Sequence, residues 1–243
     1  MMEIVAETGS TSTDLAARLR AGERIAEGHW LVADRQTAGR GRLGREWTDG
    51  LGNFMGSTPV HLRAGDPPAP TLALVAGLAL HGVLAGLLPG GHRAQLKWPN
   101  DVMVDGAKLA GILLERERDT VIIGIGVNLA AAPALPDRPT VALADLAVPP
   151  TRDTFAQTLA DGLAGEIERW RSYGLGPVIA RWKAAAHPVG TALAVIDEGG
   201  SISVEGQFAG LGEDGSLQLR LADGQLRAIH AGDVGYARKP QES

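Results

Sequence analysis

Four arginines lie in one short segment of an acidic chain, where they could bind an anion. They are Arg35, Arg40, Arg42 and Arg45, with Gly39, Gly41 and Gly44 interspersed among them. Guanidinium groups bind phosphate or carboxylate oxygens through two aligned donors, and glycine lets a backbone approach a ligand closely. The segment is therefore either an anion-binding loop that becomes ordered around its ligand or a solvated, flexible surface loop.

The three glycines also match G-x-G-x-x-G, the fingerprint of dinucleotide-binding loops. In that motif a helix begins directly after the glycines. Here no helical pattern follows Gly44, and two of the variable positions are arginine. We therefore do not expect a dinucleotide site.

A second polar cluster follows a short strand pattern in Lys97-Trp98-Pro99-Asn100-Asp101. Pro99 breaks the strand, which leaves Asn100 and Asp101 at its end. An amide and a carboxylate there could orient a nucleobase, a metal ion or an incoming amine. Asn and Asp after Pro are also ordinary turn residues, so both interpretations stay open at this point.

Two further segments place polar groups beside apolar runs. Lys108 comes directly before one such run, so its ammonium group either points into a cavity or is solvated at a turn. Gly124 and Gly126 interrupt another run, which indicates close approach by a backbone or by a flat ligand. Asn128 follows them and supplies an amide.

The composition excludes several classes of protein. The 243 residues include no Cys, which removes disulfides, thiolate zinc sites and cysteine nucleophiles. The six His lack metal-ligand spacing, so we predict no metal site in the chain. A net charge of −5 argues against general nucleic-acid binding. The N-terminus has no signal-peptide pattern, and the apolar residues 71–88 predict a buried helix, because they lack an aromatic belt.

The elements that position these groups mix helix and strand patterns. Helical periodicity marks a helix ending near Arg20 and helices at residues 152–171 and 178–186. Apolar runs predict strands at residues 30–33, 53–62, 94–98, 102–104, 109–115 and 120–126, with a hairpin turn at Asp105-Gly106. After Pro188, four short strand patterns predict a small β-barrel or sandwich. We expect an α+β fold, with a central mixed or antiparallel sheet in residues 1–186 and a small β-domain in residues 187–243.

Taken in order, these segments resemble the biotin protein ligases. The resemblance rests on Ser10-Thr11, GRGRLGREW, KWPND, KLAGILLE and GIGVNL, and covers nearly the whole chain. It implies a catalytic domain like that of class II aminoacyl-tRNA synthetases and an SH3-like C-terminal barrel. It also implies that biotin and ATP, with Mg²⁺, form biotinyl-5′-AMP and pyrophosphate. A lysine of a biotin carboxyl carrier protein would then attack this anhydride and release AMP.

The resemblance assigns roles residue by residue. Lys108 would bridge the biotin carboxyl group and the α-phosphate, Arg40 would belong to a loop closing over both, and Asp101 would bind or deprotonate the incoming lysine; these three are the catalytic candidates. The expected biotin contacts are Ser10, Thr11, Ser12, Gln36, Gly39, Arg40, Gly41, Arg42, Lys108, Gly111 and Ile112. The expected nucleotide contacts are Arg42, Arg45, Trp47, Asn100, Lys108 and Asn128.

The chain departs from the family pattern at Ser12, where the family usually has Asn, and a hydroxyl differs in reach from an amide. Nine residues precede Ser10, too few for the helix-turn-helix repressor domain of some family members. We expect a cytoplasmic ligase, monomeric or homodimeric, that binds neither DNA nor membranes. The alternatives are a lipoate or octanoate ligase or transferase of the same fold, and a non-catalytic biotin sensor.

Overall fold

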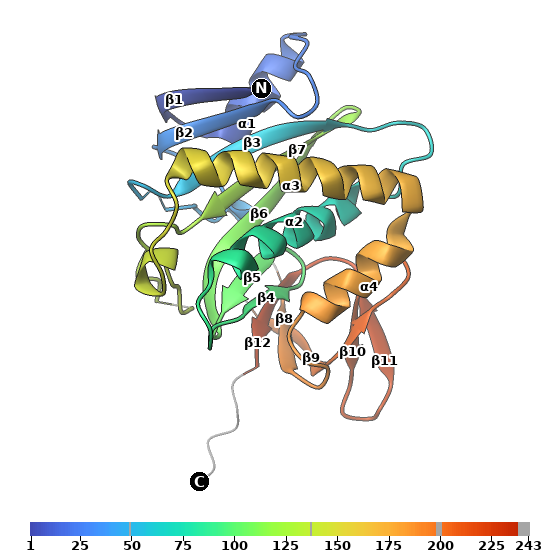
Figure 1. Ribbon diagram of the computed structural model, residues 1–243. Coiled ribbons are helices and arrows are strands. Elements are labelled where there is room, and N and C mark those ends of the chain that lie inside the picture. Colours follow the sequence, from blue (N-terminus) through green and yellow to red (C-terminus); the bar gives the residue numbers. More distant parts are fainter. Residues whose placement is uncertain (49, 137, 198–200, 238–243) are drawn as a thin grey trace.

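The computed structural model describes residues 1–48, 50–136, 138–197 and 201–237, and contains two sheets (Figure 1). The larger sheet has seven strands and the smaller has five. Two consecutive helices, α3 (Arg152–Tyr173) and α4 (Leu175–Ala185), connect the two sheets in the chain. The fold is therefore α+β with a separate small β-unit, as the sequence predicts.

The seven-stranded sheet is mixed. Its order is β1-β2-β3-β7-β6-β5-β4, in which β1 and β2 run parallel and the other neighbours run antiparallel. The strands are β1 (Met2–Thr8), β2 (Trp30–Gln36), β3 (Phe54–His61), β4 (Ala94–Lys97), β5 (Asp101–Val104), β6 (Ala107–Glu117) and β7 (Thr120–Val127). The parallel pair needs a crossover, and α1 (Thr11–Arg20) provides it, capped by the Ser10 side chain.

Helices α2 (Leu72–Leu87) and α3 lie over one face of this sheet (Figure 1). By length and composition α2 could cross a membrane. In the structure most of its apolar side chains are buried against α3, α4 and the sheet. Leu72, Val75, Leu80 and Leu84 are completely inaccessible to solvent. The prediction of a buried helix at residues 71–88 is confirmed.

The β5–β6 hairpin forms at the predicted Asp105-Gly106 turn, where both residues have positive φ (50° and 81°). These angles are those of a type I′ turn, whose twist matches that of the flanking strands. The predicted start of the last helix at residue 178 is wrong, because α4 begins at Leu175. Pro177 lies in its first turn, where proline costs no hydrogen bond.

The five-stranded antiparallel sheet has the order β11-β10-β9-β8-β12. Its strands are β8 (Ala192–Ile196), β9 (Ile202–Leu211), β10 (Leu217–Arg220), β11 (Leu226–Ile229) and β12 (Asp233–Tyr236). The sequence predicts four of these strands and misses β12. It also misses β1. Both are edge strands: in β1 the apolar residues are mixed with two glutamates, and β12 has only four residues.

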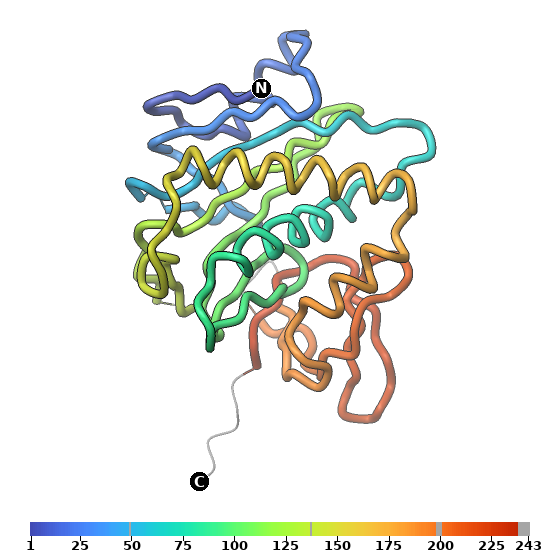
Figure 2. Tube along the Cα trace, in the orientation of Figure 1, coloured from blue at the N-terminus to red at the C-terminus, as the bar shows by residue number. Residues whose placement is uncertain are grey.

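Direct contacts join the small sheet to the end of β4. The buried Lys97 ammonium group donates to the Val234 carbonyl at 2.6 Å, and the Trp98 indole N–H donates to the Gly215 carbonyl at 3.1 Å. The red C-terminal segment accordingly runs beside the green strands of the large sheet in Figure 2. Lys97 also forms an ion pair with Asp101 at 3.1 Å, so the junction between the sheets includes a buried charge pair.

We expect Lys97→Met to lower the free energy of unfolding by about 3 kcal/mol, because it leaves the Val234 carbonyl without its donor and removes one cation from a buried carboxylate. Urea unfolding followed by circular dichroism measures this loss. Lys183→Met, at an exposed position on α4, is the matched control and should change stability by no more than about 0.5 kcal/mol. Equal stability of the two variants would contradict a structural role for Lys97.

Candidate active site

A cavity of about 380 Å³ lies on the large sheet. Side chains alternate across a strand: Ile112, Ile123 and Ile125 belong to the core that contains α2 and α3, so Gly111, Gly124 and Gly126 face the opposite side. These glycines leave space above β6 and β7. Gly111 and Gly126 are directly paired in the sheet, and together they form a flat floor.

The indole of Trp47 covers part of this floor. A Cβ on Gly126 would lie 2.2 Å from the Trp47 ring, and one on Gly111 would lie 3.1 Å from it. Any larger residue at position 126 would therefore displace the indole. Gly124 and Gly126 in an apolar run predict close approach by a backbone or a flat ligand. In the structure the flat group is the Trp47 side chain, which lies against Gly126, whereas Gly124 faces Ser57 and Leu113.

The arginine segment folds as a compact loop that returns on itself. Arg40 and Glu46 form an antiparallel bridge, and the Gly41 N–H donates to the Arg45 carbonyl at 2.8 Å. At the tip, Leu43 and Gly44 have φ values of 55° and 71°. Glycine suits this conformation at position 44, whereas Leu43 adopts a backbone region that is uncommon for its type. We refer to residues 39–47 as the arginine loop.

Groups from separate parts of the chain hold the arginine loop. Arg40 forms an ion pair of 2.7 Å with Glu115 on β6. Arg42 donates to the Asn100 amide oxygen at 3.3 Å and to the Gly232 carbonyl at 3.1 Å. Arg45 forms an ion pair with Asp233. Burial lowers the pKa of Arg42, while the charges of Asp233 and Asp101 favour its protonated form.

A buried carboxylate lies between two ammonium groups at the other side of the cavity. Lys108 is 2.7 Å from Asp101 and lies 5.8 Å from the centroid of a Trp47 ring, while Lys97 is 3.1 Å from the other oxygen of Asp101. Burial alone would raise the pKa of Asp101, but Lys97 and Lys108 outweigh it and lower the pKa to about 2. Asp101 is therefore ionised at neutral pH.

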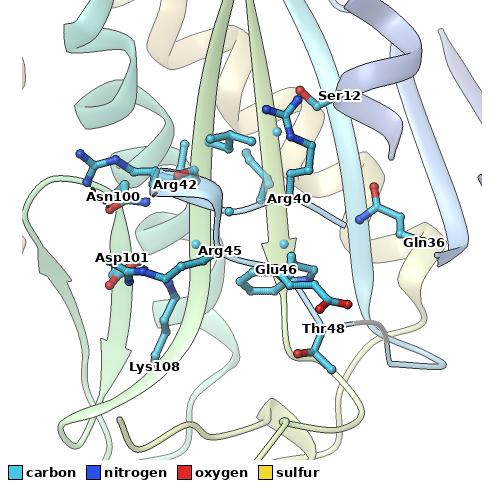
Figure 3. Close-up of a pocket in the computed structure, with 18 of the residues that line it drawn as sticks. Ser12, Gln36, Arg40, Arg42, Arg45, Glu46, Thr48, Asn100, Asp101 and Lys108 are labelled. Atoms are coloured by element: carbon cyan, nitrogen blue, oxygen red, sulfur yellow. Dashed lines mark hydrogen bonds and ion pairs between the residues drawn. The ribbon is translucent and has the colours of Figure 1, made fainter. Parts of the chain in front are cut away.

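The N-terminus of α1 supplies a row of hydroxyl groups at the opposite end of the cavity. Ser10, Thr11 and Ser12 are all buried. The Thr11 N–H donates to Oε1 of Gln36 at 2.9 Å, and the Thr11 hydroxyl lies 2.8 Å from that of Ser57. Figure 3 shows Gln36 and Ser12 on one side of the arginine loop and Lys108 with Asp101 on the other. The loop thus lies between a polar, uncharged end and a charged end.

Asn128 anchors the segment that follows the sheet. Its amide nitrogen donates to the carbonyls of Lys108 (3.4 Å) and Val141 (3.3 Å). Its buried amide oxygen has no hydrogen-bond partner among the described residues. An unpaired buried acceptor is unusual, and this one lines the cavity, where it could accept a hydrogen bond from a ligand.

The structure brings the predicted site residues together with one exception. All of them except Gly39 line the cavity. Gly39 is not part of the lining. A Cβ there would come within 2.5 Å of the Trp47 carbonyl oxygen, so glycine allows the two ends of the arginine loop to pack closely. The lining residues that the sequence does not indicate are Glu46, Thr48, Gly56, Ser57, Leu113, Ile125, Pro133, Leu135, Arg138, Thr140 and Asp233. Several come from the proline-rich residues 130–150, which carry no motif.

The described residues also set limits on metal binding. Within residues 1–48, 50–136, 138–197 and 201–237, no three His, Asp or Glu side chains come together as a metal site would require. In the cavity, Asp101 is neutralised by two lysines and Asp233 is paired with Arg45. These carboxylates do not form a resident magnesium site.

Comparisons of this chain with family models and with related proteins agree on one family. The model of the biotin/lipoate A/B protein ligase family matches residues 8–128, and that of the biotin protein ligase C-terminal domain matches residues 193–234. A biotin–(acetyl-CoA-carboxylase) ligase of Mycobacterium tuberculosis is 37% identical, over 98% of this chain and 89% of that protein. One from Paracoccus denitrificans is 35% identical, over 96% of this chain and 99% of that protein.

Among solved structures, the fold is similar to that of a biotin protein ligase from Aquifex aeolicus in complex with biotin and ATP. The TM-score is 0.83 at 24% identity, over 98% of this chain and 99% of that one. Because the identity to full-length relatives exceeds 30% and both domain models match in order, this chain belongs to the biotin protein ligases.

Proposed function

We propose that this chain activates biotin with ATP and then transfers it to a lysine of a biotin carboxyl carrier protein. One observation carries the proposal: the arginine loop and Lys108 converge on a single glycine-floored cavity. The relatives are named for ligation of biotin to acetyl-CoA carboxylase, and a neighbour in fold holds biotin and ATP. A cavity that collects cations in an acidic chain suits two anionic reactants.

In the first step, a carboxylate oxygen of biotin attacks the α-phosphorus of ATP, the bond to the bridging oxygen breaks, and pyrophosphate leaves. ATP enters as its Mg²⁺ complex, since Mg²⁺ commonly binds through substrate phosphates. Negative charge accumulates at the α-phosphate, so donors fixed in advance lower the barrier. We assign this task to Lys108, which Asp101 holds in place at 2.7 Å.

In the second step, the ε-amine of the carrier lysine attacks the acyl carbon of the anhydride. A C–N bond forms, the C–O bond to AMP breaks, and the nitrogen loses a proton. The role of Asp101 as the base for that proton stays a prediction. A carboxylate with a pKa of about 2 is a weak proton acceptor, and its two ion pairs favour a role in positioning Lys108.

The arginine loop would keep water from the anhydride until the carrier arrives. Arg42 is best placed to do this, because it reaches from the loop to Asn100 on one side and to the C-terminal sheet on the other. We further propose a catalytic domain in residues 1–186, a C-terminal domain in residues 187–243, and action in the cytoplasm, which an absence of Cys favours. Whether the chain is monomeric or homodimeric stays a prediction.

A purified carrier domain tests the proposed function. With ATP, Mg²⁺ and biotin present, mass spectrometry should detect one added biotinyl group on the carrier, and omission of any one reactant should abolish the gain. Lipoate is offered in parallel. Consumption of lipoate alone would support the rival ligase or transferase, and tight biotin binding without AMP release would support a sensor.

Lys108→Ala should reduce adenylation by about 10²-fold or more, on the scale of losing one preorganised donor. Biotin-dependent exchange of pyrophosphate into ATP measures the rate of this step alone. Lys183→Ala, at an exposed lysine on α4, controls for loss of a cation elsewhere. If Lys108→Ala stays within a few-fold of the native rate, Lys108 does not act on the α-phosphate.

Arg42→Gly should release biotinyl-5′-AMP faster, because it removes both contacts that hold the loop to Asn100 and to the C-terminal sheet. The released anhydride should then label lysines of bystander proteins such as serum albumin, detected by streptavidin blot. Arg35→Gly, from the same basic segment but outside the cavity lining, is the control. Background labelling by an Arg42→Gly variant that still forms adenylate would refute the lid role.

A further inference from the structure

We propose that Glu115 is a positioning residue that makes the cavity selective for substrates with an N–H donor, by fixing the direction of the Ser12 hydroxyl. The inference rests on the proposed function, because it concerns the end of the cavity where biotin would bind. Glu115 is the last residue of the KLAGILLE segment on β6 and lies beside the arginine loop, but no role for it follows from the sequence alone.

Glu115 accepts a hydrogen bond from one residue of the candidate site and forms an ion pair with another. The Ser12 hydroxyl donates to one carboxylate oxygen, and Arg40 lies 2.7 Å from the other. Ser12 is 4% exposed and lines the cavity. Figure 3 shows the Arg40 guanidinium extending toward Ser12. The two groups are brought together by a carboxylate that is 103 residues away from Ser12 in the chain.

This arrangement fixes what Ser12 can offer to a ligand. A serine hydroxyl has one proton, and an ionised carboxylate can only accept. The proton is therefore committed to Glu115, in a charge-assisted hydrogen bond. Only the lone pairs of Ser12 Oγ remain for the cavity, so Ser12 can accept a hydrogen bond from a ligand but cannot donate one.

The orientation of the Gln36 amide is also fixed, and it leaves a donor for the cavity where Ser12 leaves an acceptor. A backbone N–H can only donate, so the amide oxygen of Gln36 must be the atom that faces the Thr11 N–H at 2.9 Å. The side-chain nitrogen of Gln36 is consequently the group left to act as a donor. Gln36 also lines the cavity. At this end of the cavity Ser12 therefore offers an acceptor and Gln36 a donor.

A ureido group matches this pair, since it carries N–H donors next to a carbonyl acceptor. The dithiolane ring of lipoate carries neither group, so it would leave Ser12 and Gln36 unpaired. Sites built to hydrogen-bond a substrate reject analogues that lack the partner group. An Asn side chain at position 12 would carry its own acceptor and donor, but a serine needs a neighbour to set its direction. Glu115 is that neighbour.

Steady-state kinetics of biotin-dependent pyrophosphate exchange test the inference on the full-length chain. Glu115→Ala and Ser12→Ala should each raise the KM for biotin by about tenfold, the effect of one hydrogen bond to a substrate. The KM for ATP and kcat should change by no more than about twofold. Desthiobiotin keeps the ureido group and lacks the thiophane ring, so its KM should shift by the same factor.

The double variant separates positioning from other roles. If Glu115 acts through Ser12, adding Glu115→Ala to Ser12→Ala should change the KM for biotin by no more than about twofold. Glu115→Gln keeps an acceptor oxygen for Ser12 and should retain a KM closer to native than Glu115→Ala does. Glu117→Gln removes a carboxylate from the same strand that pairs with Arg20 outside the cavity, and should have no effect.

Three results would overturn the inference. The first is a native KM for biotin in Glu115→Ala. The second is a Glu115→Ala effect that persists in full in the Ser12→Ala background. The third is an equal rise of both KM values with a lowered melting temperature, which indicates a structural role. Native enzyme that exchanges pyrophosphate with lipoate and not with biotin would overturn the proposed function itself, and this inference with it.

Discussion

A buried carboxylate held between two ammonium groups determines the geometry at the centre of this molecule. Asp101 is 6% exposed and pairs with both Lys97 and Lys108. Taking such charges out of water is costly, and the cost is offset only when each charge has a partner at close range. Lys97 uses a further proton to bind Val234 in the small sheet. Asp101 therefore fixes the position of Lys108 and, through Lys97, the position of the C-terminal sheet.

The arginine loop is held by weaker contacts, and this difference suits a loop that must exchange partners. Arg40 and its partner Glu115 are 53% and 22% exposed, and ion pairs in contact with solvent contribute little stability. Phosphate and carboxylate oxygens of a bound substrate can replace such partners at small cost. Arg42, which is more buried, binds an amide and a carbonyl instead of a carboxylate, so its charge is left for an anion.

The sequence predicts those parts of the site that depend on local chain geometry. The Asp105-Gly106 turn indicates the hairpin that carries Lys108, and Gly126 on β7 indicates a close approach, made by Trp47. Contacts between residues that are far apart in the chain cannot be predicted from these sequence patterns. Asp233 reaches Arg45 only because β12 joins β8 in the small sheet. No pattern near Glu115 shows that β6 brings it to Arg40 and Ser12, since its partners are set by strand order.

Three consecutive residues at the start of β12 contact the cationic groups of the site, and Asp233 among them lines the cavity. Gly232 binds Arg42, Asp233 binds Arg45, and Val234 binds Lys97. Two of these contacts use backbone carbonyls, which every residue type possesses, so the side chains at positions 232 and 234 carry no chemical signal. The sequence of this segment therefore gives no indication of these contacts. The arginine loop and the Asp101 cluster therefore both contact the segment at the start of β12.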